Sequence, residues 1–144
     1  MKLKHERLSA EFEKWLFTYR QREKKYFHTV LHHFTGKDKG NPHSHPWNFT
    51  SYILAGSYVE KRYIIHPDGN WSSTLIHRTT EAVHKVTADT VHEIVELPEG
   101  ECWTVVVPTS PQPQPWHFWQ FDETGIYRRL PKERTFKKYQ SRQL

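Results

Sequence analysis

The sequence is organised around one stretch that carries two closely spaced histidines, Asn41-Pro42-His43-Ser44-His45-Pro46-Trp47-Asn48-Phe49. It leads into a short apolar segment that ends at Gly56. In an extended strand, residues i and i+2 point to the same side, so His43 and His45 can direct both imidazoles at one point. Such a pair offers two nitrogen ligands to a metal ion. The pair alone fits a loop with two solvent-exposed histidines equally well, and the rest of the chain has to decide.

The composition is that of one domain large enough to bury a hydrophobic core. The chain has 144 residues, of which 35% are hydrophobic and 15% aromatic, and each aromatic side chain buries a large area. No apolar run reaches the roughly 20 residues that a membrane helix needs, and the residues after Met1 lack the apolar stretch of a signal peptide. A single cysteine, Cys102, excludes an intrachain disulfide and a cysteine-rich zinc site. We therefore expect a cytoplasmic, reducing setting and no membrane association.

The net charge of +5 is unevenly distributed along the chain. Residues 1–26 carry +4 and residues 125–144 carry +6, whereas residues 27–124 carry −5. Basic ends can contact nucleic acid or another polyanion, but they are more commonly solvated termini. Because the sequence contains no motif of a nucleic-acid-binding domain, we do not expect a nucleic acid as partner.

The hydrophobic period changes near residue 26. Before it, Phe12, Trp15, Leu16 and Tyr19 follow helical spacing after a capping Ser9, which predicts a helix over 9–25. After it, short apolar runs separated by turn residues predict β-strands. These predicted strands cover 27–34, 49–54, 58–66, 71–80, 82–86, 91–97, 102–107, 116–121 and 126–130. One helix followed by many short strands predicts an all-β sandwich or barrel.

The histidine pair, the strand closing at Gly56, and His92, which follows His45 by 47 positions, resemble the metal-binding motifs of the cupins. Cupins are small jelly-roll barrels, and the resemblance covers about residues 29–121, most closely to stand-alone cupins of bacteria and phages whose activity is largely unassigned. It implies a cupin-type jelly-roll barrel or sandwich in which His43, His45 and His92 hold a metal ion. The expected organisation is an N-terminal helical segment (1–28), a cupin domain (29–130) and a basic C-terminal tail (131–144).

One position departs from the cupin motif. The motif places a glutamate ligand four residues after the second histidine, and here that position is Phe49, with Asn48 before it as a poor substitute. The loss of a carboxylate weakens a site for a hard divalent ion. A resemblance to three-histidine thiol dioxygenases of the same fold implies a neutral centre for Fe(II), with Zn, Ni or Mn as chemical alternatives. In the other outcome no metal binds, and the histidines act as acid/base or hydrogen-bonding groups, as in sugar-nucleotide epimerases that pair a histidine with a tyrosine.

Glu60 is the candidate for the missing charge. If its face of the strand points inward, Glu60 can replace the absent carboxylate ligand or act as a general base, and otherwise it forms a surface ion pair. His84 is a reserve among the remaining histidines, because it lies one turn and one strand from His92. Cys102 is expected to be a buried, inert thiol.

The predicted substrate pocket consists of Trp47, Asn48, Ser51 and Trp103. Trp47 follows the motif directly and can roof the pocket, although it fits a plain core position as well. Ser51 shares the strand parity of Phe49 and is expected to point inward. Trp103 lies on the most apolar strand, where core packing is the alternative.

The sequence therefore favours a metal-binding cupin that acts as a small-molecule enzyme of the oxygenase type, with His43, His45, His92 and Glu60 as catalytic candidates. A metal-free isomerase or epimerase of the sugar-nucleotide kind is one alternative. A non-catalytic module that binds a small ligand is another. The substrate is not determined by the sequence, and a homodimer formed through the predicted helix stripe stays open.

Overall fold

The computed structural model describes residues 2–20, 26–38, 40–109 and 114–140. These residues form twelve β-strands and no helix, so the all-β expectation is confirmed. The strands are β1 (Lys2–Ser9), β2 (Phe12–Arg20), β3 (Tyr26–Phe34), β4 (Phe49–Gly56), β5 (Tyr58–Ile65), β6 (Trp71–Arg78), β7 (Val83–Val86), β8 (Val91–Glu96), β9 (Cys102–Pro108), β10 (Phe118–Asp122), β11 (Gly125–Arg129) and β12 (Lys137–Lys138).

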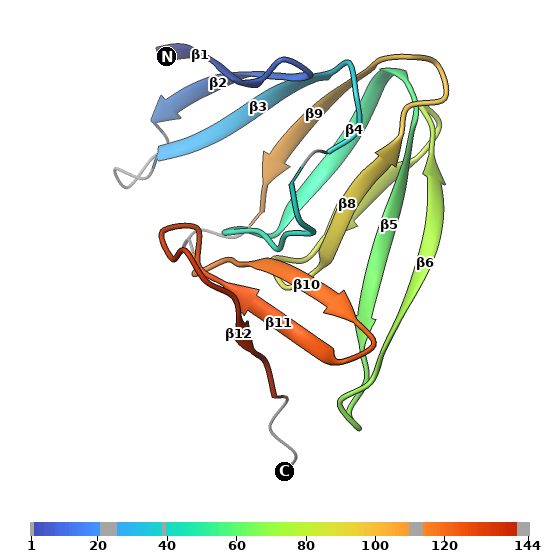
Figure 1. Ribbon diagram of the computed structural model, residues 1–144. Coiled ribbons are helices and arrows are strands. Elements are labelled where there is room, and N and C mark those ends of the chain that lie inside the picture. Colours follow the sequence, from blue (N-terminus) through green and yellow to red (C-terminus); the bar gives the residue numbers. More distant parts are fainter. Residues whose placement is uncertain (1, 21–25, 39, 110–113, 141–144) are drawn as a thin grey trace.

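The strands form one large and two small antiparallel sheets (Figure 1). The large sheet has six strands in the order β1-β2-β3-β9-β4-β7, and the small ones are β6-β5-β8 and β10-β11-β12. The backbone of His43 bridges β8 at His92 and β10 at Phe118. The first histidine of the sequence motif thus joins the two small sheets into a second layer.

The predicted N-terminal helix is wrong, because residues 2–20 form a β-hairpin. β2 pairs with β1 on one side and with β3 on the other, so its backbone hydrogen bonds go to neighbouring strands. Phe12 and Leu16 face inward and Trp15 faces outward, where it stacks on Trp103 across the sheet. Aromatic side chains pack well on a pleated surface, and tertiary pairing here overrides the helical spacing. Residues 21–25 of the predicted helix lie outside the described residues.

The other predicted strands are confirmed to within two residues at each end. The turn signals explain this accuracy. Gly69 has a φ of 88°, and Asp68 accepts a hydrogen bond from the backbone N–H of Asn70, which closes the turn between β5 and β6. Gly56 has a φ of 77°, and a Cβ there would lie 2.1 Å from the carbonyl oxygen of Glu101. Only glycine therefore allows β4 to end so close to the start of β9.

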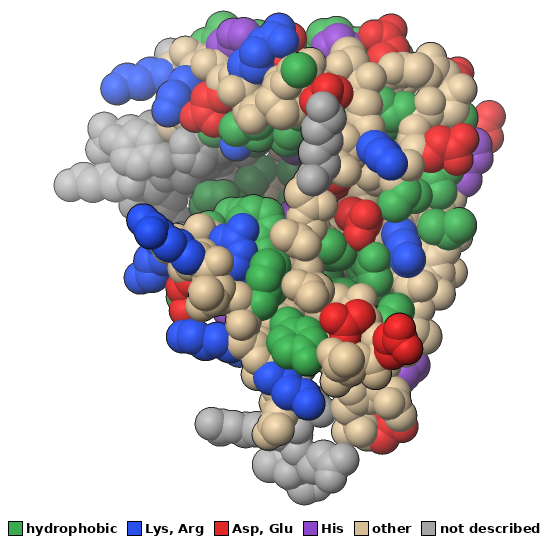
Figure 2. Space-filling model, in the orientation of Figure 1, with side chains coloured by type: hydrophobic (Ala, Val, Ile, Leu, Met, Phe, Trp, Pro, Cys, Tyr) green, Lys and Arg blue, Asp and Glu red, His purple; other side chains and the backbone are tan. Residues whose placement is uncertain are grey.

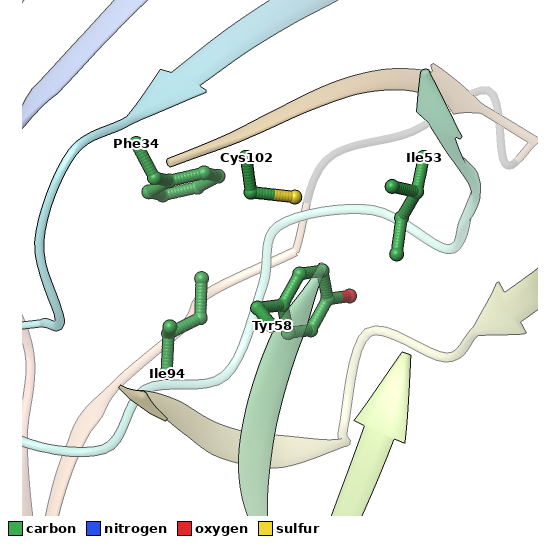
Figure 3. Packing of buried hydrophobic residues seen from close by; sticks show 5 residues of the cluster. All are labelled: Phe34, Ile53, Tyr58, Ile94 and Cys102. Carbon is green, nitrogen blue, oxygen red and sulfur yellow. The ribbon is translucent and has the colours of Figure 1, made fainter. Parts of the chain in front are cut away.

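The core consists of two clusters of buried side chains. The first lies between the two layers and contains Phe34, Ile53, Tyr58, Ile94 and Cys102, which point toward one another (Figure 3). The second contains Val91, Trp119 and Ile126 and lies between β8 and the β10–β11 hairpin. Cys102 has no exposed surface, and burial raises the pKa of its thiol to about 12. The expected buried thiol is confirmed.

Two strands bear on the predicted domain organisation, which stays a prediction. Residue 28 lies within β3, so the expected N-terminal segment shares the large sheet with the rest of the chain. In the basic tail, β12 pairs with β11. Among the described residues, no helix is long and apolar enough to cross a membrane.

Candidate metal centre

Three histidines bring their rings together between the two layers. His43 and His45 come from the segment before β4, and His92 comes from β8. One ring nitrogen from each lies within 4.8 Å of the other two, and the Nε2 atoms of His45 and His92 are 3.1 Å apart. Nitrogen ligands of one tetrahedral or octahedral metal ion lie about 3.0–3.5 Å apart. The separation of 3.1 Å lies in this range, and the three rings together form a donor set that could hold a divalent metal ion, as the sequence motif predicts.

The backbone fixes the direction of the two motif histidines. His43 exchanges two backbone hydrogen bonds with His92, at 3.0 and 3.2 Å, which places two of the three rings side by side. Ser44 is buried and points the other way, where its hydroxyl accepts a hydrogen bond of 2.9 Å from the backbone N–H of His117. Because successive side chains alternate in extended backbone, His43 and His45 face the same side.

Glu60 lies behind His92 rather than among the ligand atoms. The side chain is fully buried, and its Oε2 is 2.5 Å from Nδ1 of His92. The other carboxylate oxygen accepts hydrogen bonds from Arg78 at 2.8 Å and from Arg62 at 3.3 Å. This contact corrects the expectations of a direct metal ligand and of a surface ion pair. With the proton on Nδ1, His92 presents the lone pair of Nε2 toward His45, which is the tautomer that a metal ligand needs.

The electrostatics of these groups suit a neutral nitrogen site. Burial opposes the ionisation of Glu60, but its hydrogen bond with His92 and the charges of Arg78 and Arg62 outweigh burial and lower its pKa to about 2. Burial and the neighbouring His92 lower the pKa of His43 to about 4 and that of His45 to about 2. Both rings are therefore neutral at pH 7, and neutral imidazole is the form that binds metal ions.

The three histidines line a cavity of about 500 Å³ between the layers. Trp47 and Ser51, two of the residues predicted for a substrate pocket, also line this cavity. Phe49, at the sequence position where the cupin motif has a glutamate, also lines the cavity, and its ring makes a T-shaped contact with that of His45 at a centroid distance of 5.0 Å. In the space-filling view, hydrophobic side chains line a hollow between β1–β3 and the β10–β12 sheet (Figure 2). The volume is in the range of small-molecule sites.

Two predicted pocket residues lie elsewhere. Asn48 is exposed and absent from the cavity wall, and its side-chain oxygen accepts a hydrogen bond of 2.7 Å from the backbone N–H of Ala88. Trp103 lies on the outer face of the large sheet and stacks on His33 at a centroid distance of 3.8 Å. The inward residues of β9 are its neighbours Cys102 and Thr104, which are both buried. Strand parity places Trp103 outside the cavity, whereas Asn48 precedes β4 and directs its side chain to the backbone of Ala88, so both expectations are corrected.

A buried tyrosine–histidine pair lies at the same cavity. The hydroxyl of Tyr58 is 3.0 Å from Nε2 of His84, and Tyr58 lines the cavity wall. Burial, assisted by the charge of Arg78, lowers the pKa of His84 to about 4, and burial raises the pKa of Tyr58. His84 is the reserve histidine of the sequence analysis. Its pairing with Tyr58 could have been anticipated only from the register of β4, β5 and β7.

The wall opposite the metal centre carries two polar residues that the sequence analysis did not single out. Lys14 on β2 and His32 on β3 are cross-strand partners and line the cavity. Lys14 was not predicted as a site residue, because a helix over residues 9–25 would place it on the polar face. In a strand, the alternation of Phe12, Lys14 and Leu16 places all three on one face.

Comparison with known proteins identifies the fold. No protein-family model and no curated protein matches the sequence. Solved structures do match. The polyketide cyclase RemF from Streptomyces resistomycificus is 19% identical with a TM-score of 0.54, over 84% of this chain and 82% of that one. Hydroxypropylphosphonic acid epoxidase from S. wedmorenis is 10% identical with a TM-score of 0.53, over 75% and 56%. A mutant of oxalate decarboxylase from Bacillus subtilis is 12% identical with a TM-score of 0.52, over 74% of this chain but 28% of that chain.

These proteins share the cupin fold, and this chain has it too. The predicted jelly-roll architecture is confirmed, apart from the N-terminal helix. At such low identity the likeness establishes the fold alone. The chain spans less than a third of the oxalate decarboxylase chain and more than four fifths of RemF.

Proposed function

We propose that this protein is a metal-dependent enzyme that acts on a small molecule in the cavity, with a three-histidine centre for Fe(II) and chemistry of the oxygenase type. The observation that carries the proposal is the convergence of His43, His45 and His92, backed by the buried carboxylate of Glu60. Similar structures include metal enzymes, among them an oxalate decarboxylase described with Mn(II) centres. Zn, Ni or Mn could occupy the same nitrogen ligands.

The residues of the chain divide the work between them. A bound divalent ion would polarise a substrate group and, as Fe(II), support oxygen chemistry. His43, His45 and His92 would hold the ion, and Glu60 keeps the proton of His92 on Nδ1, away from the ligand atom. Phe49 supplies no charge and no ligand atom, so substrate would provide any further ligand to the ion. Trp47 and Ser51 shape the wall that the substrate would contact.

Metal analysis of the purified protein tests this proposal. We expect one equivalent of iron per chain after expression in iron-supplemented medium, and its loss in His92→Ala. The matched control is His77→Ala, because His77 is exposed on β6 and should leave the metal content unchanged. A folded wild-type protein that binds no divalent metal ion would overturn the metal centre. Bound iron without oxygen consumption by any candidate substrate would overturn only the oxygenase assignment.

A second candidate function rests on the pair Tyr58–His84. A neutral histidine next to a tyrosine can remove and return a proton, which is the acid/base pair that a metal-free isomerase or epimerase needs. The 3.0 Å contact between the two side chains supports it. The test is hydrogen–deuterium exchange at a carbon beside a ketone, with keto-sugar nucleotides and metal-stripped protein. Exchange that disappears in Tyr58→Phe favours this candidate, and its absence with every such nucleotide argues against it.

We also infer a cytoplasmic protein that works without a nucleic-acid partner. The single, fully buried Cys102 is compatible with a reducing setting.

A homodimer is supported by the outer face of the large sheet, where Tyr52 on β4 and Val83 on β7 are exposed neighbours. Light scattering over a range of protein concentrations tests this state, and a monomer at all concentrations would exclude it. A small-ligand-binding module without catalysis remains the outcome if metal and ligand bind but no reaction follows.

A further inference from the structure

The inner face of the large sheet carries a polar row across an otherwise apolar wall. Lys14 on β2 pairs with His32 on β3, and His32 pairs with Thr104 on β9. On each strand the neighbours on the same face are apolar. They are Phe12 and Leu16 on β2, Val30 and Phe34 on β3, and Cys102 and Val106 on β9.

Lys14 is the positively charged member of this polar row. All three members line the cavity, and the wall they form faces the layer that holds the metal centre. Nζ of Lys14 is 3.5 Å from Glu6, whose closer partner is Lys4 at 2.9 Å. A distance of 3.5 Å is longer than a good charged hydrogen bond, and an ammonium has three donors. The contact with Glu6 therefore leaves Lys14 with donors for a further anion.

The two other carboxylates of the site, Asp38 and Glu60, are hydrogen-bonded to the opposite layer. Among the described residues of the wall, Asp38 is the one carboxylate, and its Oδ2 accepts a hydrogen bond of 2.7 Å from the backbone N–H of Ile94. Glu60 is withdrawn behind His92 and is engaged by Arg78 and Arg62. His32 is held by edge contacts with Phe12 and Phe34 at centroid distances of 5.1 and 5.5 Å. An apolar cavity whose wall carries a lysine with donors left over from its ion pair with Glu6 favours an anionic ligand.

We propose that the cavity binds a small carboxylate, with the carboxylate group on Lys14 and His32 and an apolar body against Leu16, Val30 and Val106. This inference rests on the proposed function only in taking the cavity as the substrate site. The carboxylate subsite lies on the large sheet, and the three histidines lie on the opposite layer. A substrate held in this way would present the end remote from its carboxylate to the metal centre.

Matched ligand pairs test the carboxylate subsite on protein stripped of metal with EDTA. The pairs are benzoate with benzamide, 2-naphthoate with 2-naphthamide, and hexanoate with hexanamide, measured by isothermal titration calorimetry. We expect the carboxylate of at least one pair to bind about tenfold or more tightly than its amide, because hydrogen bonds to charged groups are worth more than neutral ones. Lys14→Met should abolish this preference, and Lys14→Arg should retain part of it. High salt should weaken binding of the carboxylate more than that of the amide.

The matched control is Lys85→Met, which removes an exposed lysine on the outer face of β7 and should leave the preference unchanged. Equal affinity of carboxylate and amide in every pair overturns the proposal, and so does a preference that survives in Lys14→Met. Failure of all six compounds to bind at millimolar concentration also overturns it. Metal content is measured separately on untreated protein, so loss of the carboxylate subsite and loss of the metal centre give different results.

Discussion

Replacement of Glu60 by glutamine is the sharpest test of how the metal centre is supported. The carboxylate contacts Nδ1 of His92 at 2.5 Å on one oxygen and two arginines on the other. Glutamine has the same shape but offers one acceptor and one donor. If its amide nitrogen faces His92, the ring proton moves to Nε2, which can no longer bind a metal ion. If the amide nitrogen faces Arg78 and Arg62 instead, its N–H groups and those of the arginines are donors that oppose one another.

The size of the effect follows from these contacts. Loss of a group that orients a metal-bound histidine typically weakens metal affinity by about 10–100-fold, or about 1.4–2.7 kcal/mol. One buried donor left without an acceptor also lowers the free energy of unfolding by about 1–3 kcal/mol. We therefore expect Glu60→Gln to fold, to lose stability in that range, and to bind metal at least about tenfold more weakly.

Zinc is the practical probe, because it does not change oxidation state. Competition with a chromophoric chelator gives the dissociation constant, and urea unfolding of the apo-protein gives the free energy of unfolding. Glu96→Gln is the control, since Glu96 is exposed on the same strand as His92. If Glu60→Gln binds zinc as tightly as the wild type, Glu60 does not set the tautomer of His92.

Three further predictions concern Phe49, His84 and Cys102. Phe49→Glu should destabilise the apo-protein by about 1–3 kcal/mol, because it buries a carboxylate in an apolar wall. The same substitution should tighten zinc binding at least about tenfold, because it adds a charged ligand. Unchanged zinc affinity would contradict the place assigned to Phe49 beside the metal centre. The pKa of His84 is lowered to about 4 in the folded protein, so its contribution to stability is present above about pH 6.5 and is lost as pH falls toward 4. Urea unfolding at pH 7 and pH 4 measures how much free energy of unfolding each protein loses on acidification. This loss should be smaller in His84→Gln than in the wild type by up to about 3 kcal/mol. An equal loss in the two proteins would contradict the buried neutral state of His84. Cys102 should resist iodoacetamide in the native protein at pH 8, because its thiol is fully buried with a pKa raised to about 12. It should react after denaturation, and mass spectrometry measures the labelling in both states. Rapid labelling of the native protein would show that the first core cluster opens.

Local signals explain which parts of the fold and site could be predicted from the sequence. The strands from β3 onward are bounded by turn residues whose conformation depends on the residues themselves, such as Asp68 and Gly69 between β5 and β6. The histidine pair could be identified because alternation in extended backbone is also a local property. The roles of Glu60 and Trp103 depend instead on which face of a strand points inward. That choice is set by pairing with distant strands, and a change of parity moves a side chain to the other face.

The N-terminal hairpin shows the consequence for the binding site. Phe12, Leu16 and Tyr19 satisfy helical spacing, but β2 is held by β1 and by β3. In turn, β3 is paired with β9, which is distant from it in the sequence. This non-local pairing makes residues 12–16 a wall of the cavity. It also places Lys14 in register with His32. The metal centre could be predicted because its motif is contiguous, whereas the opposite wall is assembled from three strands whose register no local pattern specifies. The specificity of the cavity is therefore expected to depend most on the part of the chain that was hardest to predict.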